Sequence, residues 1–258
     1  MDRAVYEEHA QLESDHWWFV GRRDILESVL TRYLPTSGAD RILDVGCGTG
    51  GMLPMLAQFG TVEGMEGEPL AVEHCQATYR GFDVRVGQIP ADVPADGTFD
   101  LVTAFDVIEH LDDDVGALRA LRSAVRPGGT VAVTVPALQW LWSDHDTVNG
   151  HRRRYTRRRL REALDAADLD VVHVSYFNMV LLPIVATARL AQRVRGPVVA
   201  PSSDFSMPSP RLNRLLTGVL RWERSMVAAR GLPVGVSLVA VARRSTTLLA
   251  DGRGGRGS

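Results

Sequence analysis

Short apolar runs alternate with helical patterns between residues 41 and 135, and this alternation constrains the fold more than any other feature of the chain. Apolar runs of this length, broken by turn residues, are typical of buried strands. The expected strands span residues 41–45, 61–66, 82–86, 99–105 and 130–135. Strands that alternate with helices run parallel and are joined by right-handed crossovers. The pattern therefore predicts an α/β fold with a doubly wound sheet.

Helical patterns also flank and interrupt this region. Apolar spacing predicts one helix over residues 4–34, and two more, over 179–194 and 210–229, inside a long excursion before the last apolar run. An excursion of that length needs structure of its own. The expected organisation is an N-terminal helical cover (1–38), a core (39–177), a helical lid or substrate insertion (178–235), the last core strand (236–244) and a disordered tail (245–258).

Composition excludes several classes of protein. All 29 basic residues are arginine, so chemistry that needs a lysine amine, such as Schiff-base catalysis or a Walker-type phosphate loop, is excluded. A net charge of −2 argues against a nucleic-acid partner. Two cysteines give no disulfide framework, and no apolar stretch reaches the roughly 20 residues of a membrane span. The polar N-terminus does not resemble a signal peptide, and we expect a cytoplasmic protein.

A glycine-rich turn follows the first expected strand. Glycines there let the backbone approach a ligand, and the next helix offers free N–H groups. Gly46, Gly48 and Gly51 fit the dinucleotide fingerprint, and Glu66 lies at the spacing used to bind a ribose diol. The spacing alone leaves a nicotinamide cofactor and other adenosine ligands equally open.

Residues 42–50, Ile-Leu-Asp-Val-Gly-Cys-Gly-Thr-Gly, closely resemble the first motif of class I S-adenosylmethionine (SAM) methyltransferases. The resemblance continues, in order, through residues 62–66, 87–89, 98–102, 105–111 and 126–130. It implies SAM as the methyl donor, S-adenosylhomocysteine as the product, and a Rossmann-like, mostly parallel seven-stranded sheet. The last strand of that sheet, at residues 236–242, would be antiparallel.

The resemblance also implies a role for individual residues. Asp44 and the loop backbone would hold the methionine end of SAM, and Glu66 would bind the ribose. Gln88, where most relatives have Asp, and Ile89 would meet the adenine. The cofactor site expected in full contains Trp17, Arg22, Asp44, Gly46, Cys47, Gly48, Gly50, Glu66, Gln88, Ile89, Phe105 and Asp106. In this site the Phe105 carbonyl would face the sulfonium of SAM, and Arg22 would pair with the carboxylate of SAM. Trp17 would either enclose the sulfonium by cation–π attraction or pack in the core.

Two histidines are candidates for the catalytic base. His110 follows the strand 99–105 at the edge where ligands bind in this architecture, and His145 lies between two acids that would stabilise its protonated form. Asp106, Glu109 and His110 resemble the acidic-x-x-Glu-His segment of ubiquinone-pathway O-methyltransferases, where a divalent ion assists. We assign no metal to the protein, although the types of these three residues would allow a divalent ion to bind.

Aromatic and polar residues near the same edge are candidate acceptor contacts. They are Trp140, Trp142, His151, Tyr155, Tyr176 and Asn178. The arginine-rich segment 151–161 is interpreted either as the exposed basic face of a helix capped by Thr156 or as a contact for anions, including a membrane surface.

Together these features predict a SAM-dependent methyltransferase of secondary metabolism that acts on a small, apolar or aromatic molecule. Oxygen is favoured as the nucleophile over nitrogen or carbon. The protein would be a monomer or homodimer, with peripheral membrane contact possible. The alternatives are a SAM enzyme with other chemistry, a nicotinamide-dependent oxidoreductase, and a non-catalytic SAM-binding or membrane-docking module.

Overall fold

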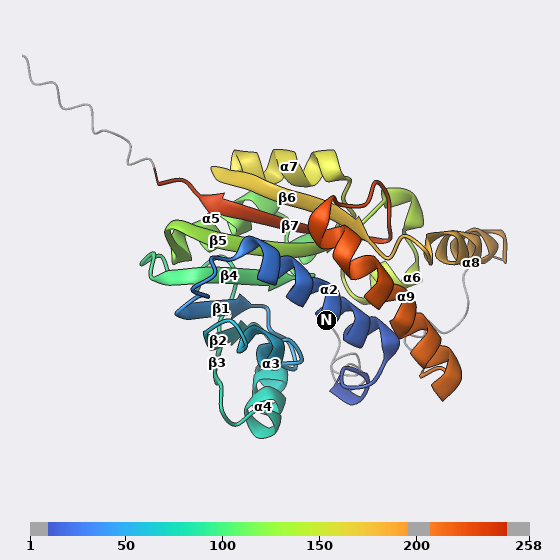
Figure 1. The fold of residues 1–258 in the computed structure, drawn as a ribbon, viewed down its shortest axis with the longest axis horizontal. Coiled ribbons are helices and arrows are strands. Elements are labelled where there is room, and N and C mark those ends of the chain that lie inside the picture. Colours follow the sequence, from blue (N-terminus) through green and yellow to red (C-terminus); the bar gives the residue numbers. More distant parts are fainter. Residues whose placement is uncertain (1–9, 196–206, 247–258) are drawn as a thin grey trace, which may run out of the picture.

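The fold is centred on a seven-stranded sheet with helices on both faces, and a computed structural model describes residues 10–195 and 207–246 of it (Figure 1). The strand order is β3-β2-β1-β4-β5-β7-β6. The strands are β1 (Arg41–Val45), β2 (Thr61–Glu66), β3 (Asp83–Val86), β4 (Phe99–Phe105), β5 (Val125–Pro136), β6 (Leu169–Phe177) and β7 (Ser237–Arg244). The prediction of a Rossmann-like, mostly parallel sheet is confirmed.

The first five strands pair in parallel, whereas β7 is antiparallel to both of its neighbours, β5 and β6. The chain leaves β1 towards β2 on one side and reaches β4 on the other, so the strand order reverses between β1 and β4. In open α/β sheets a ligand binds at the carboxyl ends of the strands at such a switch point.

Strand β5 begins earlier than the sequence predicts. The predicted strand covers residues 130–135, but the strand already pairs at Val125, opposite Phe99. The register then shifts, so that Leu101 lies opposite Thr130. An irregularity of this kind lets extra residues leave the ladder without ending the strand.

Eight helices are described in the resolved ranges beside two short 3₁₀ turns. The helices are α2 (Trp17–Tyr33), α3 (Leu53–Leu56), α4 (Pro69–Thr78), α5 (Asp114–Ala124), α6 (Asp144–Val148), α7 (Arg157–Ala166), α8 (Leu182–Arg195) and α9 (Pro210–Ala229). The 3₁₀ turns are η1 (Ile108–His110) and η2 (Gln139–Leu141). Both helices expected in the excursion are present. The tail predicted to be disordered lies, from residue 247 on, outside the described residues.

The prediction of a single helix over residues 4–34 is wrong. Residues 1–9 lie outside the described part of the chain, and a turn at 13–15 separates a short helical segment from α2. His16 caps the new helix, because its Nδ1 accepts a hydrogen bond from the backbone N–H of Trp18 at 3.3 Å. The apolar spacing does not register this break, since the cap is a single side chain.

Helix α2 runs beside α9 although the two are far apart in the sequence (Figure 1). Arg221 on α9 binds Asp24 on α2, with 2.6 Å between Nε and Oδ2, and the Asn213 carboxamide accepts from the Trp17 N–H at 2.8 Å. The backbones approach closely at Gly21, where an added Cβ would lie 2.5 Å from Cδ1 of Leu220. The N-terminal helix is therefore anchored by the segment that follows β6.

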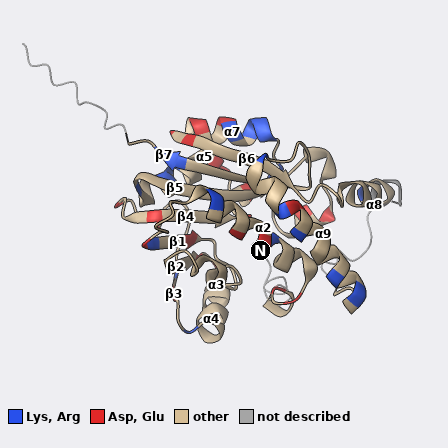
Figure 2. Ribbon diagram, viewed as in Figure 1, with Lys and Arg blue, Asp and Glu red and all other residues tan. Residues whose placement is uncertain are grey.

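The arginine-rich segment mostly forms ion pairs and caps. Thr156 caps α7 by accepting from the Arg159 N–H at 3.2 Å, and the exposed Arg158 pairs with Glu162 one turn on, at 3.7 Å. Figure 2 shows basic and acidic residues together along α7. Arg153 pairs with Asp114 at 3.0 Å. Across the described ranges, no helix has both the length and the apolar character needed to cross a membrane.

Candidate cofactor and acceptor site

A cavity of about 620 Å³ opens at the carboxyl ends of β1, β2 and β4. Its walls include Asp44 and Gly46 after β1, Glu66 at the end of β2, and Phe105 at the end of β4. Helix α2 closes one side with aromatic and arginine side chains. The cavity thus lies at the switch point of the sheet, where the fold favours ligand binding.

The glycine loop adopts a backbone that side chains disfavour. Gly46 and Gly48 have φ values of +73° and +56°, in the left-handed region. A Cβ on Gly46 would also lie 2.5 Å from Cγ2 of Val107. Gly50, predicted as a cofactor contact, does not line the cavity; an added Cβ there would meet the Cys75 thiol at 2.5 Å. Its part is to let the loop pack on α4.

Two acids are held in fixed orientations at the floor of the cavity. Asp44 is almost wholly buried and accepts a hydrogen bond from Thr103 Oγ1 at 2.6 Å. Its burial raises the pKa of Asp44 to about 7. Glu66 accepts from the N–H groups of Gly48 at 2.9 Å and Glu68 at 3.0 Å. These bonds tie the acid at the end of β2 to the glycine loop.

Gln88 and Ile89 line the cavity beyond Glu66. The Gln88 side-chain amide donates to the Gly67 carbonyl at 3.0 Å. That bond uses the NH₂ group and leaves the side-chain carbonyl as the acceptor for a base such as adenine.

The first turns of α2 form the cover over the cavity. Trp17, Trp18 and Arg22 all line it, and Trp18 stacks on Phe177 with 5.9 Å between ring centroids. Arg22 is buried and contacts Asp106 at 2.7 Å and Thr134 at 3.0 Å. Thr134 in turn donates to the other Asp106 oxygen at 3.0 Å. Both oxygens of Asp106 are therefore occupied within the fold.

Glu13 is a cavity residue that the sequence analysis missed. It is buried in the turn before α2, lines the cavity and accepts hydrogen bonds from Thr49 at 2.7 Å and Tyr79 at 3.2 Å. No motif contains it, and only the packing of the N-terminal turn on the glycine loop brings it there.

Three histidines and a buried acid gather at the other end of the cavity. Glu109, His110, His145 and His151 all line it. The ring of His151 lies 4.7 Å from that of His110 and 6.3 Å from that of His145. Burial, together with the neighbouring His151, lowers the pKa of His110 to about 4. Burial and the nearby Asp106 raise the pKa of Glu109 well above its usual range.

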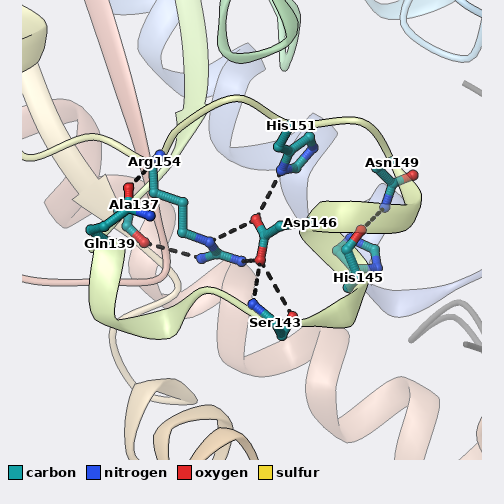
Figure 3. A network of polar contacts seen from close by, with 8 residues as sticks. All are labelled: Ala137, Gln139, Ser143, His145, Asp146, Asn149, His151 and Arg154. Carbon is teal, nitrogen blue, oxygen red and sulfur yellow. Dashed lines mark hydrogen bonds and ion pairs between the residues drawn. The ribbon is translucent and has the colours of Figure 1, made fainter. Parts of the chain in front are cut away.

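Asp146 organises this end of the cavity (Figure 3). Its carboxylate accepts from His151 Nδ1 at 2.9 Å, from two nitrogens of Arg154 at 2.7 and 2.9 Å, and from the Ser143 N–H at 2.9 Å. Burial alone would raise the pKa of Asp146, but these bonds from His151 and Arg154 hold it well below its usual range. The acid expected to support His145 binds His151 and Arg154 instead.

The structure separates the predicted site residues into two groups. All of the predicted cofactor contacts except Gly50 line the cavity, and so do His110, His145, His151 and Asn178. Trp140, Trp142, Tyr155 and Tyr176 do not. Tyr155 is fully buried and donates to Asp114 at 2.8 Å, and the Tyr176 hydroxyl accepts from the Arg157 N–H at 3.1 Å, so both serve the fold. Trp140 is 49% exposed on η2.

The metal ligands implied by the acidic-x-x-Glu-His resemblance do not fit as a set. Asp106 is held by Arg22 and Thr134, and an arginine in contact with a carboxylate opposes cation binding there. Glu109 is the opposite case, since neither of its buried oxygens has a hydrogen-bond partner on another residue of the described chain.

Comparisons with known proteins agree with this geometry. A family model described as a methyltransferase domain matches residues 19–174. A ubiquinone biosynthesis O-methyltransferase from Aeromonas salmonicida is 37% identical over 100 residues, which cover 36% of this chain and 42% of that protein. A "probable S-adenosylmethionine-dependent methyltransferase" from Mycolicibacterium smegmatis is 29% identical over 62% of each chain. This chain therefore spans less than two thirds of either relative.

Among solved structures, a Haloferax volcanii complex between the Trm112 methyltransferase activator and a methyltransferase is similar, with a TM-score of 0.61 and 19% identity. The match covers 95% of this chain and 96% of that one. At this identity the likeness concerns the fold alone. It confirms the predicted fold. The family match supports SAM as the cofactor of this domain.

Proposed function

Because this chain belongs to the methyltransferase domain family, we propose that it transfers the methyl group of SAM to a hydroxyl oxygen of a small, apolar or aromatic acceptor. The observation that carries the proposal is that one cavity joins the acids Asp44 and Glu66 to the histidines at its far end. A methyl donor and its acceptor must share one enclosure for an in-line displacement. Oxygen as the nucleophile is supported by the relatives named as O-methyltransferases.

In this proposal the cofactor lies over the glycine loop. Glu66, fixed by two backbone N–H groups, binds the ribose hydroxyls, and the Gln88 carbonyl accepts from the adenine amino group. Asp44 in its ionised form attracts the methionine ammonium. Arg22 keeps a buried Nε without a hydrogen-bond partner among the described residues, which suits it to bind the methionine carboxylate.

The acceptor lies between the sulfonium and the histidine cluster. Trp18, Leu111 and Val185 supply apolar wall beside Asn178. The attacking oxygen forms a bond to the methyl carbon as the carbon–sulfur bond breaks, and sulfur leaves as a thioether. The hydroxyl proton passes to the protein or to water. With its low pKa, His110 is a weak proton acceptor, which leaves His145 as the better candidate of the two predicted bases.

The first test is calorimetric titration of the purified protein with SAM, S-adenosylhomocysteine and NADH side by side. We expect micromolar binding of both adenosyl ligands and no heat with NADH. A mass-spectrometric assay then compares matched acceptors on one aromatic ring: a catechol, the corresponding aminophenol methylated at nitrogen, and a carbon nucleophile. Transfer to the catechol oxygen supports the proposal. SAM binding with transfer only to nitrogen or carbon refutes the oxygen assignment.

A further inference from the structure

Glu109 is buried without a bonding partner, in a position where that is costly. Its side chain is 0% exposed, and neither oxygen contacts a donor on another residue of the described chain. A buried carboxylate in this state either takes up a proton or pairs with a cation. The neighbouring arginine, Arg22, is already engaged by Asp106. Glu109 therefore lacks a protein cation, and the question is what else it faces.

Two imidazoles face it. Ligand atoms of Glu109, His110 and His151 all lie within 4.8 Å of one another. Two ligands of one tetrahedral metal ion, at about 2.0–2.1 Å from it, are separated by roughly 3.4 Å. Binding of an ion would therefore draw the three side chains closer together. The backbone bond from the Arg152 N–H to the Glu109 carbonyl, at 2.7 Å, fixes the loop of His151 against the turn that carries the other two residues.

His151 has the outer contact that metal-binding histidines use. His151 donates from Nδ1 to Asp146 at 2.9 Å, so Nε2 is the nitrogen left to coordinate an ion. Asp146 is itself clamped by Arg154 and Ser143 (Figure 3). The backbone carbonyl of Gly150 is the polar group beside the His110 ring. A second ring nitrogen bonded to a carboxylate or a carbonyl is the usual way a protein orients a ligating histidine.

From this geometry we propose that Glu109, His110 and His151 form a divalent transition-metal site, and that Asp106 is not a ligand. The set departs from the acidic-x-x-Glu-His segment, because a histidine from the loop after α6 replaces the first acid. Two imidazoles and one carboxylate favour an ion such as Zn²⁺ over Mg²⁺, which prefers oxygen ligands. All three residues line the cavity, so an ion bound by them would lie beside the proposed acceptor site. An ion there would lower the pKa of an acceptor hydroxyl.

The test measures metal binding and needs no acceptor. The full chain, freed of metal by a chelator, is titrated with Zn²⁺ and Mg²⁺ in a calorimeter, and Co²⁺ absorption reports the coordination geometry. We expect one Zn²⁺ per chain, at least about 100-fold weaker binding of Mg²⁺, and the intense visible bands of tetrahedral Co²⁺. No Zn²⁺ binding, or Mg²⁺ binding of equal strength, overturns the proposal.

Four variants locate the ion. His151→Ala and Glu109→Gln should each weaken Zn²⁺ binding at least 100-fold. Asp106→Asn and His145→Ala, two matched neighbours outside the set, should change it less than about threefold. If Asp106→Asn loses Zn²⁺ binding while His151→Ala retains it, the ligands are those of the acidic-x-x-Glu-His segment, and the set proposed here is overturned.

A further variant addresses the outer contact, and two controls address folding. Asp146→Asn should weaken Zn²⁺ binding by about 10–100-fold, as expected for the orienting carboxylate of a metal-bound histidine. Each variant is checked by its thermal unfolding, and all except Asp106→Asn, which alters the predicted cofactor site, are also checked by their affinity for SAM. The inference goes beyond the proposed function: SAM binding without Zn²⁺ binding refutes the metal site alone, and Zn²⁺ binding without SAM binding refutes the proposed function alone.

Discussion

Arg22 and Asp106 are joined by an ion pair, with 2.7 Å between Nη2 and Oδ2, that ties helix α2 to the carboxyl end of β4. The same guanidinium donates to Thr134 on β5 at 3.0 Å. The cover over the cavity is thus attached to the sheet at the point where the methyl group would be transferred.

Removing this contact should weaken both the fold and cofactor binding. We expect Arg22→Ala to lower the free energy of unfolding by about 1.5–3 kcal/mol, the usual loss for hydrogen bonds to charged groups. Urea unfolding measures it, and calorimetry should show weaker SAM binding. Arg23→Ala is the matched control for stability alone, since within the described residues its guanidinium donates to the backbone carbonyls of Glu13 and Ser14, whereas its place in the cavity wall excludes it as a control for SAM binding. Equal losses in both variants would contradict the assignment.

Two acids on strand β2 provide a direct test of the cofactor site. Glu66→Ala should weaken SAM binding by about 1–3 kcal/mol, because hydrogen bonds from the ribose lose their charged acceptor. Glu63→Ala should leave SAM affinity unchanged, since Glu63, on the same strand as Glu66, pairs with Arg41 of β1 at 2.7 Å and does not line the cavity. Calorimetry measures the SAM affinity of both variants. An unchanged affinity in Glu66→Ala would rule out the role of Glu66 in binding the ribose.

The raised pKa of Asp44 should make SAM affinity depend on pH. Below about pH 7 the free protein holds Asp44 protonated, and binding of the methionine ammonium must remove that proton. Affinity should therefore fall by up to about tenfold per pH unit as the pH drops below 7, and level off above it. Titrations between pH 5.5 and 8.5 measure the trend. Asp44→Asn should bind weakly at every pH; an equally steep trend in that variant would place the titrating group elsewhere.

Gly21 and Gly218 form a matched pair on the two helices that cover the sheet. Gly21→Ala should destabilise the protein by about 1–3 kcal/mol, because the new methyl group meets Leu220 at 2.5 Å. Gly218, within α9, has open space beside it, so Gly218→Ala should add about 0.5–1 kcal/mol of stability. Thermal and urea unfolding compare them, and a stability gain in Gly21→Ala would mean that the helices are not packed this closely.

Features that depend on local pattern were predictable from the sequence. Strands β1, β2 and β4 have the expected bounds, since their buried apolar runs end at turn residues. Asp44 and Glu66 were found because motif and spacing identify the ends of adjacent parallel strands. The start of β5 was not predictable from the sequence, because a strand that continues through Pro127 and two glycines depends on pairing with β4.

The acceptor end of the cavity was predicted less well, for reasons of packing. Helix α6 is too short to show a helical period, so its capping residue Asp146 looked like a neighbour of His145 rather than of His151 and Arg154. Tyr155 has the composition of a binding residue, yet it is buried under α7. Proximity in the sequence does not show which side chains point into the protein. Here the path of the loop after α6 determines which residues contact Asp146.

The most C-terminal of the described strands, β7, lies inside the sheet and not at its edge. Because β7 lies between β5 and β6, the strand β6 has no described sheet partner other than β7, and β5 keeps one open edge until β7 arrives. A nascent chain that has emerged only as far as α9 thus leaves β6 unpaired on both sides and β5 unpaired on one, and unpaired strand edges are the kind of surface on which chains aggregate. Completion of the described sheet therefore requires residues 237–244, and a chain that ended before them would lack the strand that joins β5 to β6.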